Sequence, residues 1–360
     1  MIVTEEAIKQ QISMITHPQL KKNLLEYLSS VAVRDKIVEV VFEVTASELP
    51  VMKELQQSIE KNISNLSNVE KVHFILTTHR SVEKKSSSPT LGTLLGVKSI
   101  VAIASGKGGV GKSTTAINIA LALRKLGHRV GILDADIYGP SLPRMLGIHE
   151  KPGVTEDKKL IPIQKYDLKV MSIGFMVSEK EPIIWRGPMV QGALQQMLKD
   201  VVWGDLDVLV VDMPPGTGDI QLTLAQQVSL TGAVIVSTPQ DIALVDARKG
   251  LAMFTRVRVP ILGIVENMSL FCCPKCQSVT EIFGHGGARK EAESLGVPFL
   301  GEVPIELSIR QGCDQGTPVG IAFPDSPSSQ IYQAIGHKLW LEIEKNLDAQ
   351  ARQTPEITMA

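Results

Sequence analysis

The sequence predicts an α/β protein in which a small α+β domain precedes a doubly wound, mostly parallel sheet. Three observations support this prediction. Short apolar, β-branched runs alternate with helix-forming segments from residue 98 onward, as in strands joined by crossover helices. A glycine-rich loop follows the first of these runs. Residues 81–94 begin with a polar, serine-rich stretch that cannot support a core, so they are expected to link two domains.

The first domain is expected over residues 1–80. Segments with helical spacing and segments with alternating apolar residues follow one another there, which indicates a small α+β fold. The expected elements are a helix over Glu5–Leu28 interrupted at Pro18, a strand over Lys36–Thr45, an amphipathic helix over Leu49–Ile63 and a strand over Lys71–Thr77.

The second domain is expected over residues 95–345, and the polar residues 346–360 are expected to form a flexible tail. In a doubly wound sheet, ligands bind outside the carboxyl ends of the strands. The expected strands are Ile100–Ala104, Arg129–Leu133, Val208–Asp212, Ala233–Ser237, Ile261–Glu266 and Pro298–Gly301.

A phosphate-binding loop follows the first of these strands. Its sequence fits the pattern Gly-x-x-x-x-Gly-Lys-Ser/Thr, in which backbone N–H groups close around phosphate oxygens. Lys112 would bring positive charge to the β- and γ-phosphates, and Ser113 would ligate Mg²⁺. The flanking strand and helix patterns favour this interpretation over a glycine-rich turn without a ligand. The residues expected to bind nucleotide here are Gly106, Lys107, Gly108, Gly109, Val110, Gly111, Lys112, Ser113 and Thr114.

Two aspartates follow the next expected strand. Asp134 and Asp136 come directly after Arg129–Leu133 and are candidates for orienting water or holding Mg²⁺. Phosphoryl transfer needs positioning and charge neutralisation more than covalent chemistry, and the water-orienting task falls most naturally to Asp136. The alternative is that both carboxylates cap a turn.

A third aspartate, Asp212, follows the apolar run Val208–Val211. An acidic residue in this place is the Mg²⁺-side partner of a phosphate loop, although a helix cap is the alternative. The segment Met213–Asp219 reads Met-Pro-Pro-Gly-Thr-Gly-Asp and can change position when a γ-phosphate is present.

The four cysteines are too few and too clustered for a disulfide framework. Cys273 and Cys276 form a Cys-x-x-Cys pair, whereas structural zinc sites and 4Fe-4S clusters commonly take four soft ligands. Adjacent Cys272 is awkwardly placed and Cys313 is distant in sequence, but a symmetric dimer would supply two thiolates from each subunit. A redox dithiol and a zinc ion shared by a dimer are the alternatives.

Asn267 follows the expected strand Ile261–Glu266. Its side-chain amide offers both a donor and an acceptor, so it could read the edge of a nucleobase. Turn formation is the alternative for a lone asparagine.

Composition argues against two classes of partner. Lys and Arg total 37 against 38 for Asp and Glu, without a long basic block, and aromatic residues make up 4%, so the sequence predicts no nucleic-acid binding. No apolar run approaches the roughly 20 residues that span a bilayer. The first residues lack a basic n-region and an apolar h-region, so the sequence predicts a cytoplasmic protein without a membrane partner.

Together these motifs resemble the Mrp/ApbC-type ATPases, iron-sulfur cluster carriers of the deviant phosphate-loop class that also contains MinD and the nitrogenase iron protein. The resemblance covers about residues 92–340. Residues 1–80 resemble, more loosely, the small domain often fused ahead of such ATPases, but they contain no cysteine and have His17-Pro18-Gln19 where that domain often has Asp-Pro-Glu. Besides the loop, the matching motifs are Asp134–Ser141, Trp185–Met189, Asp212–Asp219, Thr238–Gln240, Glu266–Ser269 and Cys273–Cys276.

The resemblance implies a homodimer that hydrolyses ATP with Mg²⁺, in which Lys107 reaches the nucleotide of the partner subunit. It also implies a labile 4Fe-4S cluster that is bridged by Cys273 and Cys276 of both subunits and passed to apo iron-sulfur proteins, with cluster assembly factors as further partners. Asn267 would contact adenine, and the N-terminal domain is expected to dock partners. The catalytic residues expected on this basis are Lys107, Lys112, Asp136 and Asp212, and the metal ligands are Cys273, Cys276, Ser113 and Asp212.

A MinD-like spatial regulator or nucleotide-dependent scaffold is the alternative function. Such a protein would usually carry a basic amphipathic helix at its C-terminus. The segment Gly336–Leu347 has few basic residues, so the sequence favours the carrier.

Overall fold

The computed structural model describes residues 5–13, 15, 23–34, 37–45, 49–66, 69, 71–79, 94, 96–176 and 187–353. The chain forms two compact units, Met1–Ser87 and Ser88–Ala360. The division between them falls within the expected linker 81–94, of which Leu94 alone belongs to the described residues.

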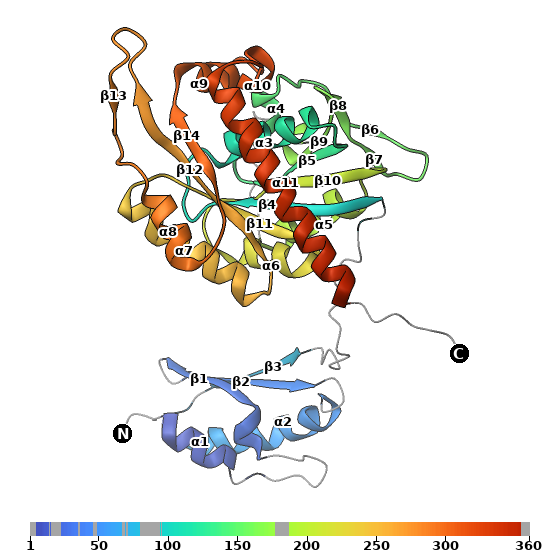
Figure 1. The fold of residues 1–360 in the computed structure, drawn as a ribbon. Helices are drawn as coiled ribbons and strands as arrows, with labels where there is room; N and C mark the ends of the chain where they lie inside the picture. The colour runs from blue at the N-terminus through green and yellow to red at the C-terminus, as the bar shows by residue number, and fades with distance from the viewer. Residues whose placement is uncertain are drawn as a thin grey trace, which may run out of the picture. The chain divides into compact units, whose positions relative to one another are not determined.

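The first unit is a three-stranded sheet packed against helices (Figure 1). Its central strand β2 is antiparallel to β1 and parallel to β3. Every second side chain of β2, from Val38 to Val44, is buried with apolar residues of α1 and α2, so the alternation along β2 decides which face of the sheet carries the core. The elements are α1 (Glu5–Ser13), the 3₁₀ helix η1 (Leu24–Tyr27), β1 (Leu28–Arg34), β2 (Ile37–Thr45), α2 (Leu49–Ser64) and β3 (Lys71–His79).

The helix expected over Glu5–Leu28 with an interruption at Pro18 is present in its first part as α1, whereas its last part is the short 3₁₀ helix η1. Helix α1 ends at Ser13, and the side chain of Asn23 begins η1 by accepting a hydrogen bond from the Leu25 backbone N–H at 3.1 Å. Strand β1 begins at Leu28, the last residue of the expected helix, and pairs with β2 with a register shift between Leu28 and Ser30. The motif His17-Pro18-Gln19 lies outside the described residues.

The second unit contains the remaining elements. Its strands are β4 (Val97–Ala104), β5 (Val130–Asp134), β6 (Gly153–Val154), β7 (Leu160–Ile161), β8 (Ile163–Lys165), β9 (Leu168–Ser172), β10 (Leu206–Asp212), β11 (Gly232–Ser237), β12 (Ile261–Cys272), β13 (Val279–Thr280) and β14 (Phe299–Ile305). Its helices are α3 (Lys112–Lys125), α4 (Leu142–Met145), η2 (Ile173–Phe175), α5 (Gly187–Lys199), α6 (Asp219–Gln227), α7 (Asp241–Arg256), α8 (Gly287–Leu295), α9 (Leu307–Asp314), α10 (Val319–Ala322) and α11 (Pro327–Gln353).

Nine strands of this unit form one sheet within the described residues, in the order β13-β12-β11-β4-β10-β5-β9-β8, with β14 paired to β12. Strands β9, β5, β10, β4, β11, β12 and β14 run parallel, and β13 and β8 are antiparallel additions. Helices α3 and α11 pack together on one face, and α5 to α8 cover the other (Figure 1). Parallel crossovers lead away from β4 in both directions, and such connections are right-handed as a rule, which produces two layers. The doubly wound fold is confirmed.

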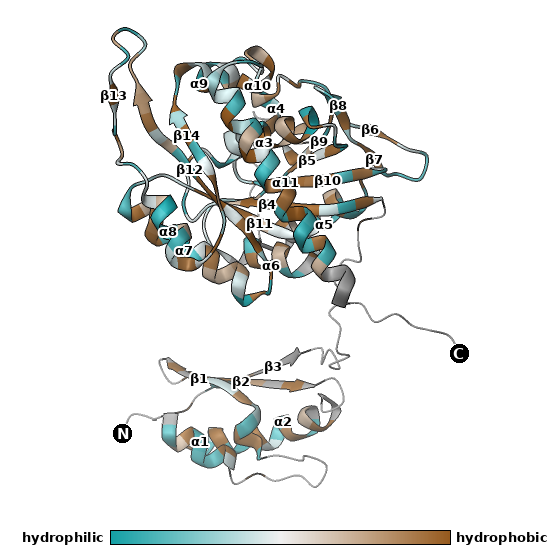
Figure 2. Ribbon diagram, in the orientation of Figure 1, coloured by the Kyte–Doolittle hydropathy of each residue, from teal (hydrophilic) through white to brown (hydrophobic). Residues whose placement is uncertain are grey.

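The central strands are apolar along their length (Figure 2). Every residue of β5 and of β11 is buried, because helices cover both faces of the sheet. This burial explains why these strands are continuous apolar runs in the sequence rather than alternating ones.

All six expected strands of this unit are present, with shifts at their ends. Strand β12 continues from the expected Glu266 to Cys272, and β14 begins at Phe299 and continues to Ile305. Strands β8 and β9 were not predicted from the sequence. Helix α11 continues to Gln353, so it extends into residues 346–360, which the sequence analysis assigned to a flexible tail.

Candidate functional site

The carboxyl ends of β4, β5 and β10 meet at one edge of the sheet, which we call the phosphate end. Strand β10 lies between β4 and β5, and its last residue Asp212 is in register with Ile103 of β4 and Asp134 of β5. The loop after β4 leads into α3. The structure therefore brings the phosphate loop Gly106–Thr114 and the predicted aspartates together, at the edge where doubly wound sheets bind ligands.

The phosphate loop is shaped by glycines in conformations that other residues rarely adopt. Gly109 has φ 81° and Gly111 has φ 80°. A Cβ atom on Gly111 would lie 2.1 Å from Nδ2 of Asn267, so a larger residue would be strained at this φ and would displace the Asn267 amide. The loop ends at the N-terminus of α3, where free backbone N–H groups and the helix dipole favour an anion. The residues therefore fit a nucleotide phosphate.

Lys112 and Asp212 form a buried ion pair. Nζ of Lys112 lies 2.5 Å from Oδ1 of Asp212 and 3.3 Å from Oγ of Ser113. Burial raises the pKa of Asp212, and the Lys112 ammonium opposes this rise. The second carboxylate oxygen of Asp212 is buried without a partner among the described residues.

The oxygens of Ser113 and Asp212 are the hard donors that Mg²⁺ prefers. The unpartnered carboxylate oxygen of Asp212 and the adjacent hydroxyl of Ser113 therefore fit a magnesium ion beside the phosphate loop. Such an ion would neutralise phosphate charge.

Asp134 organises the loop that carries Asp136. The Asp134 carboxylate is fully buried and accepts hydrogen bonds from the backbone N–H groups of Asp136, Ser141 and Leu142, at 3.2, 3.0 and 3.1 Å. The hydroxyl of Ser172 donates a fourth bond at 3.1 Å. Burial and the neighbouring Asp212 raise the pKa of Asp134 to about 7. Asp134 is therefore placed to hold the loop rather than to reach a ligand.

Asp136 is more accessible than either neighbouring aspartate. Its side chain is half-buried and accepts a hydrogen bond from the Gly139 N–H at 3.3 Å. Its charge also contributes to the raised pKa of Asp212. Of the three aspartates, Asp136 alone combines proximity to the phosphate loop with partial exposure, as the water-orienting role requires.

Lys107 differs from Lys112 in its contacts. Its backbone carbonyl accepts a hydrogen bond from Oγ of Ser105 at 2.9 Å. Within the part of the chain that the structure describes, its ammonium has neither an ion pair nor a hydrogen bond. The charge of Lys107 is thus available to a group outside this chain.

The segment after Asp212 is tied to the strand beneath the phosphate loop. The Met213 N–H donates to the Ile103 carbonyl at 3.0 Å, and the Gly216 N–H donates to the Ser105 carbonyl at 3.0 Å. The amide of Gln221, on α6, donates to the Pro214 carbonyl. A change in the phosphate loop can therefore reach this segment through Ser105.

Asn267 lies beneath the phosphate loop. Its Nδ2 donates a hydrogen bond to the Val110 carbonyl at 2.8 Å, and its side chain is 6% exposed. In this structure the amide anchors the loop, a contact that the sequence analysis missed because the two residues lie 157 positions apart.

The cysteine hairpin, residues 269–286, consists of the end of β12, a tight turn, β13 and the chain that leads to α8. It projects beyond the sheet edge (Figure 1). The backbone N–H of Cys273 donates to the Ser278 carbonyl at 3.0 Å, and the Gln277 N–H donates to the Cys273 carbonyl at 2.8 Å. These bonds close the turn and bring both ends of the Cys-x-x-Cys pair together.

Cys273 and Cys276 are close enough to interact through their side chains. Cys276 is exposed, and its Sγ lies 3.1 Å from Oγ of Ser278. Hydrogen bonds from Ser278 and from Cys273 lower the pKa of the Cys276 thiol to about 7. A substantial thiolate fraction near neutral pH suits a soft metal ion or an iron-sulfur cluster.

The other two cysteines are placed differently. Cys272 is exposed, and its Sγ contacts the Gln277 carbonyl at 3.7 Å. Cys313 is buried on α9, where burial raises the pKa of its thiol to about 11, and its side chain contacts Thr114 of the phosphate loop. Cys313 therefore belongs to the phosphate end rather than to the hairpin.

Sequence reasoning missed two buried polar residues of these sites. Ser172 supports Asp134, and Glu266, at 0% exposure, accepts three hydrogen bonds around the cysteine hairpin. A charged residue at the end of the apolar run Ile261–Val265 was the available signal for Glu266. Trp185 and Arg186, from another matching motif, lie outside the described residues.

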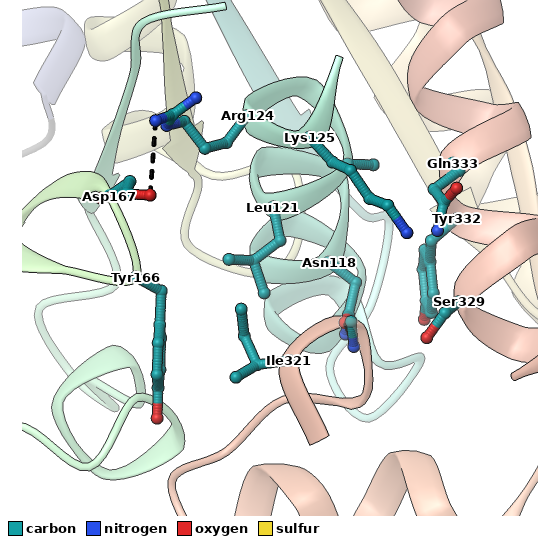
Figure 3. A pocket seen from close by; sticks show the side chains of 12 residues that line it. Asn118, Leu121, Arg124, Lys125, Tyr166, Asp167, Ile321, Ser329, Tyr332 and Gln333 are labelled. Atoms are coloured by element: carbon teal, nitrogen blue, oxygen red, sulfur yellow. Dashed lines mark hydrogen bonds and ion pairs between the residues drawn. The ribbon is translucent and has the colours of Figure 1, made fainter. Parts of the chain in front are cut away.

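A cavity of about 280 Å³ lies away from the phosphate loop, between α3, the β8–β9 turn, α10 and α11. Figure 3 shows the ion pair of Arg124 with Asp167, 3.3 Å apart, on one side and Tyr332 on the other. Lys125 already donates to the Pro324 carbonyl at 3.3 Å. Among the described residues that line this cavity, none belongs to the phosphate loop Gly106–Thr114, although Asn118 donates to the Thr114 carbonyl at 2.9 Å.

None of the described helices has both the length and the apolar character needed to cross a membrane.

Comparison with known proteins places the chain among iron-transfer proteins. The family model of NUBPL iron-transfer P-loop NTPases (ParA) matches residues 96–340. An iron-sulfur protein required for NADH dehydrogenase in mitochondria, from Arabidopsis thaliana, is 54% identical over 72% of this chain and 85% of its own length. An iron-sulfur cluster carrier protein from Escherichia coli (strain K12) is 45% identical over 90% of this chain and 88% of its own length.

Solved structures agree with this placement. A nucleotide-binding protein from Archaeoglobus fulgidus, in complex with ADP, is 36% identical and superposes with a TM-score of 0.58 over 67% of this chain and 94% of its own. The cell division ATPase MinD of Pyrococcus furiosus is 24% identical, with a TM-score of 0.53 over 69% of this chain and 99% of its own. The MinD likeness supports the fold alone.

Proposed function

The chain belongs to the family of NUBPL iron-transfer P-loop NTPases, and from this membership we propose that it is an ATP-dependent iron-sulfur cluster carrier. It would hydrolyse ATP at the phosphate end and hold a labile 4Fe-4S cluster at the cysteine hairpin. The observation that carries the proposal is strand β12, which runs from Asn267 beneath the phosphate loop to the cysteine hairpin. One strand thus links a nucleotide site to a thiol pair.

We propose that the cluster is shared by a homodimer. Each chain offers two adjacent thiols, and a 4Fe-4S cluster commonly takes four. Twofold symmetry would supply the other two from the same hairpin of the partner subunit. The hairpin also exposes apolar side chains, with Val279 61% and Ile282 51% exposed, which supports burial against another protein surface.

We assign the roles of residues at the phosphate end from the charge and the solvent exposure of their side chains. Lys112 would hold the β- and γ-phosphates, and Ser113 and Asp212 would hold Mg²⁺. Asp136, the partly exposed aspartate, would orient the attacking water. Lys107, whose ammonium has no described partner, would stabilise charge on the nucleotide of the partner subunit.

Recipients of the cluster would be apo iron-sulfur proteins, and cluster assembly factors would supply it. These assignments rest on relatives whose names describe cluster carriage and transfer. Exposed free thiols at Cys272 and Cys276 suit a reducing compartment, and we propose the cytoplasm. The N-terminal unit, which has no cysteine, would dock partners.

Anaerobic reconstitution with iron and sulfide tests this function. We expect about four iron atoms per dimer and an absorption spectrum of a 4Fe-4S cluster. Cys273→Ser and Cys276→Ser should each abolish iron retention, whereas the matched variants Cys272→Ser and Cys313→Ser should keep most of it. Full iron binding by a protein shown to be monomeric would contradict the shared cluster, and zinc without iron would contradict the carrier.

A further inference from the structure

A buried carboxylate connects the two ends of the cysteine hairpin. Glu266, on β12, is 0% exposed. Its Oε1 accepts a hydrogen bond from Oγ of Ser269 at 2.6 Å and another from the Gly286 N–H at 2.9 Å. Its Oε2 accepts one from the Ala288 N–H at 2.8 Å. Hydrogen bonds that backbone N–H groups donate to a charged acceptor are among the stronger ones in proteins.

These three donors lie on both sides of the cysteines. Ser269 precedes Cys272 on the outgoing strand, while Gly286 is the last residue of the hairpin and Ala288 lies in the first turn of α8. One side chain therefore holds the outgoing chain and the returning chain at the base of the hairpin. The residues between these fixed points include Cys272, Cys273 and Cys276.

The residue after Glu266 contacts the nucleotide site. Asn267 donates to the Val110 carbonyl of the phosphate loop at 2.8 Å. A displacement of the phosphate loop would therefore act on the backbone of β12 at the position next to Glu266.

The backbone changes direction directly after these two residues. Met268 has φ 56°, in the left-handed region that costs a non-glycine residue of order 1–3 kcal/mol. The pairing of β12 with β14 shifts register between Asn267 and Phe271. The Glu266–Ser269 hydrogen bond spans this kink, so the same carboxylate that closes the hairpin also holds its strained base.

Two further side chains complete the surroundings of Glu266. Ligand atoms of Glu266, His285 and Glu302 lie within 4.8 Å of one another. However, Glu302 already pairs with His285 at 3.2 Å and with Arg289 at 3.6 Å, and both oxygens of Glu266 already accept protein donors. These contacts favour a clamp made of hydrogen bonds over a cation site.

We propose that Glu266 is a positioning residue that couples nucleotide occupancy of the phosphate loop to the arrangement of Cys273 and Cys276. The coupling runs from Val110 through Asn267 to Glu266, and from Glu266 to both ends of the hairpin. This inference rests on the proposed function only for the identity of the cargo, because the coupling itself exists in metal-free protein.

The substitution Glu266→Gln removes this clamp with little change in volume. A carboxylate accepts at both oxygens, whereas an amide has a single acceptor oxygen and an NH₂ group that faces donors. At least one buried N–H group of Gly286 or Ala288 then loses its partner. The base of the hairpin should loosen, whereas the residues that bind nucleotide in the phosphate loop are unchanged by this substitution.

The test measures alkylation of Cys273 and Cys276, residue by residue, in the metal-free full-length protein. Rates are compared without nucleotide and with Mg²⁺ and a non-hydrolysable ATP analogue. We expect the nucleotide to change these rates about fivefold in the parent protein, in the range of typical coupling between sites. In Glu266→Gln the ratio of the two rates should fall toward one, while nucleotide affinity stays close to that of the parent.

This ratio separates coupling from a merely structural role. A hairpin that is only loosened would react faster both with and without nucleotide, and the ratio would persist. Glu291→Gln is the matched control, because Glu291 is also buried and paired, with Arg248 at 2.6 Å, but contacts α7 rather than the hairpin. Ser269→Ala, which deletes one of the three bonds, should reduce the ratio in part and replaces Glu266→Gln if that variant does not fold.

If the ratio of the alkylation rates with and without nucleotide is unchanged in Glu266→Gln, the coupling role is overturned. If Glu266→Gln does not fold, an unchanged ratio in Ser269→Ala overturns it instead. An absence of any nucleotide effect in the parent protein would overturn it as well. Iron content after reconstitution is measured in parallel. Loss of iron binding in the parent would contradict the proposed function and leave the alkylation result to decide the role of Glu266.

Discussion

The phosphate end and the cysteine hairpin differ in how far one chain completes them. At the phosphate end, Asp134 and Asp212 are fully buried, and Lys112 pairs with Asp212 inside the protein. In the hairpin, residues 276–282 are exposed, and the partners that the structure describes for the thiols of Cys272 and Cys276 lie in the same turn. The phosphate end is thus a nearly finished binding site, whereas the hairpin offers two thiols, which under the proposed function need two more from a partner subunit.

The largest expected difference between the two regions is in the reactivity of their thiols. Cys276 in the hairpin has a pKa lowered to about 7, and Cys313 at the phosphate end has a pKa raised to about 11 by burial. Because the thiolate is the reactive form, Cys276 should react more than about 10³-fold faster than Cys313 at pH 7 in metal-free protein. Alkylation followed by mass spectrometry measures both rates.

The pH dependence has a definite sign. Below its lowered pKa Cys276 is protonated, so its rate should rise as pH increases through about 7 and level off above it. Cys313 should stay slow until pH approaches 11. Comparable rates at pH 7 would show that the hairpin and the phosphate end are not different environments for a thiol.

The second largest effect concerns Lys107, which we propose to act on the nucleotide of the partner subunit. Lys107→Gln should lower ATP turnover about 10³-fold, as charge supplied in trans to a phosphoryl group does elsewhere. Each subunit should still bind nucleotide, since Lys112 keeps its contacts with Asp212 and Ser113. Steady-state hydrolysis and nucleotide affinity, measured on the same preparation, check this expectation.

Mixing variants tests whether Lys107 acts across the dimer. In a heterodimer of Lys107→Gln and Asp136→Ala subunits, a trans role puts both defects into one composite site and leaves the other site whole. Activity should then return. If Lys107 acts within its own chain, each site keeps one defect and mixing restores nothing, so an inactive mixture with heterodimers shown to form would refute the trans role.

Asp136→Ala should have the next largest effect. The substitution removes the partly exposed carboxylate but leaves Asp134, which holds the loop, in place. Turnover should fall about 10²-fold while ATP binding persists, if the residue positions the attacking water. Asp134→Asn serves as a contrast, because it replaces an acceptor oxygen of the buried loop anchor and should lower the stability of the protein. Unchanged turnover in Asp136→Ala would move the role to another residue.

The phosphate end could be predicted from the sequence almost completely, because its signals are local. The phosphate loop is a continuous motif, and Asp134, Asp136 and Asp212 directly follow apolar runs that become the buried strands β5 and β10. Parallel strands end at a common edge, so placing the strands also places the carboxylates.

The contacts that link the two regions could not be predicted in the same way. Asn267 meets Val110 across 157 residues, and Glu266 meets Ala288 across 22. Neither partner is implied by a spacing along the chain. Strand β1 was missed for a similar reason, since its pairing with β2, and not its own composition, decides its conformation.

The smallest expected effect tests the link itself at Asn267. Asn267→Ala leaves the buried Val110 carbonyl without its 2.8 Å hydrogen bond, which costs about 1–3 kcal/mol of stability. The loop should then hold nucleotide several-fold less tightly, and iron retention should change little. Asn346→Ala is the matched control, because it removes a side-chain hydrogen bond of the same length, 2.8 Å, that Asn346 Nδ2 donates to the Glu342 carbonyl in α11.

Two roles for Asn267 give different results with different ligands. If the amide anchors the phosphate loop, its loss should weaken the binding of ATP and of inorganic triphosphate by the same factor, because both ligands bind through that loop. If the amide instead reads adenine, as its donor and acceptor led us to expect from the sequence, the binding of ATP should weaken while that of triphosphate is unaffected. Calorimetry with both ligands separates these roles. Parent-like affinity for both would remove Asn267 from the nucleotide site, and with it the contact through which the phosphate end reaches the hairpin.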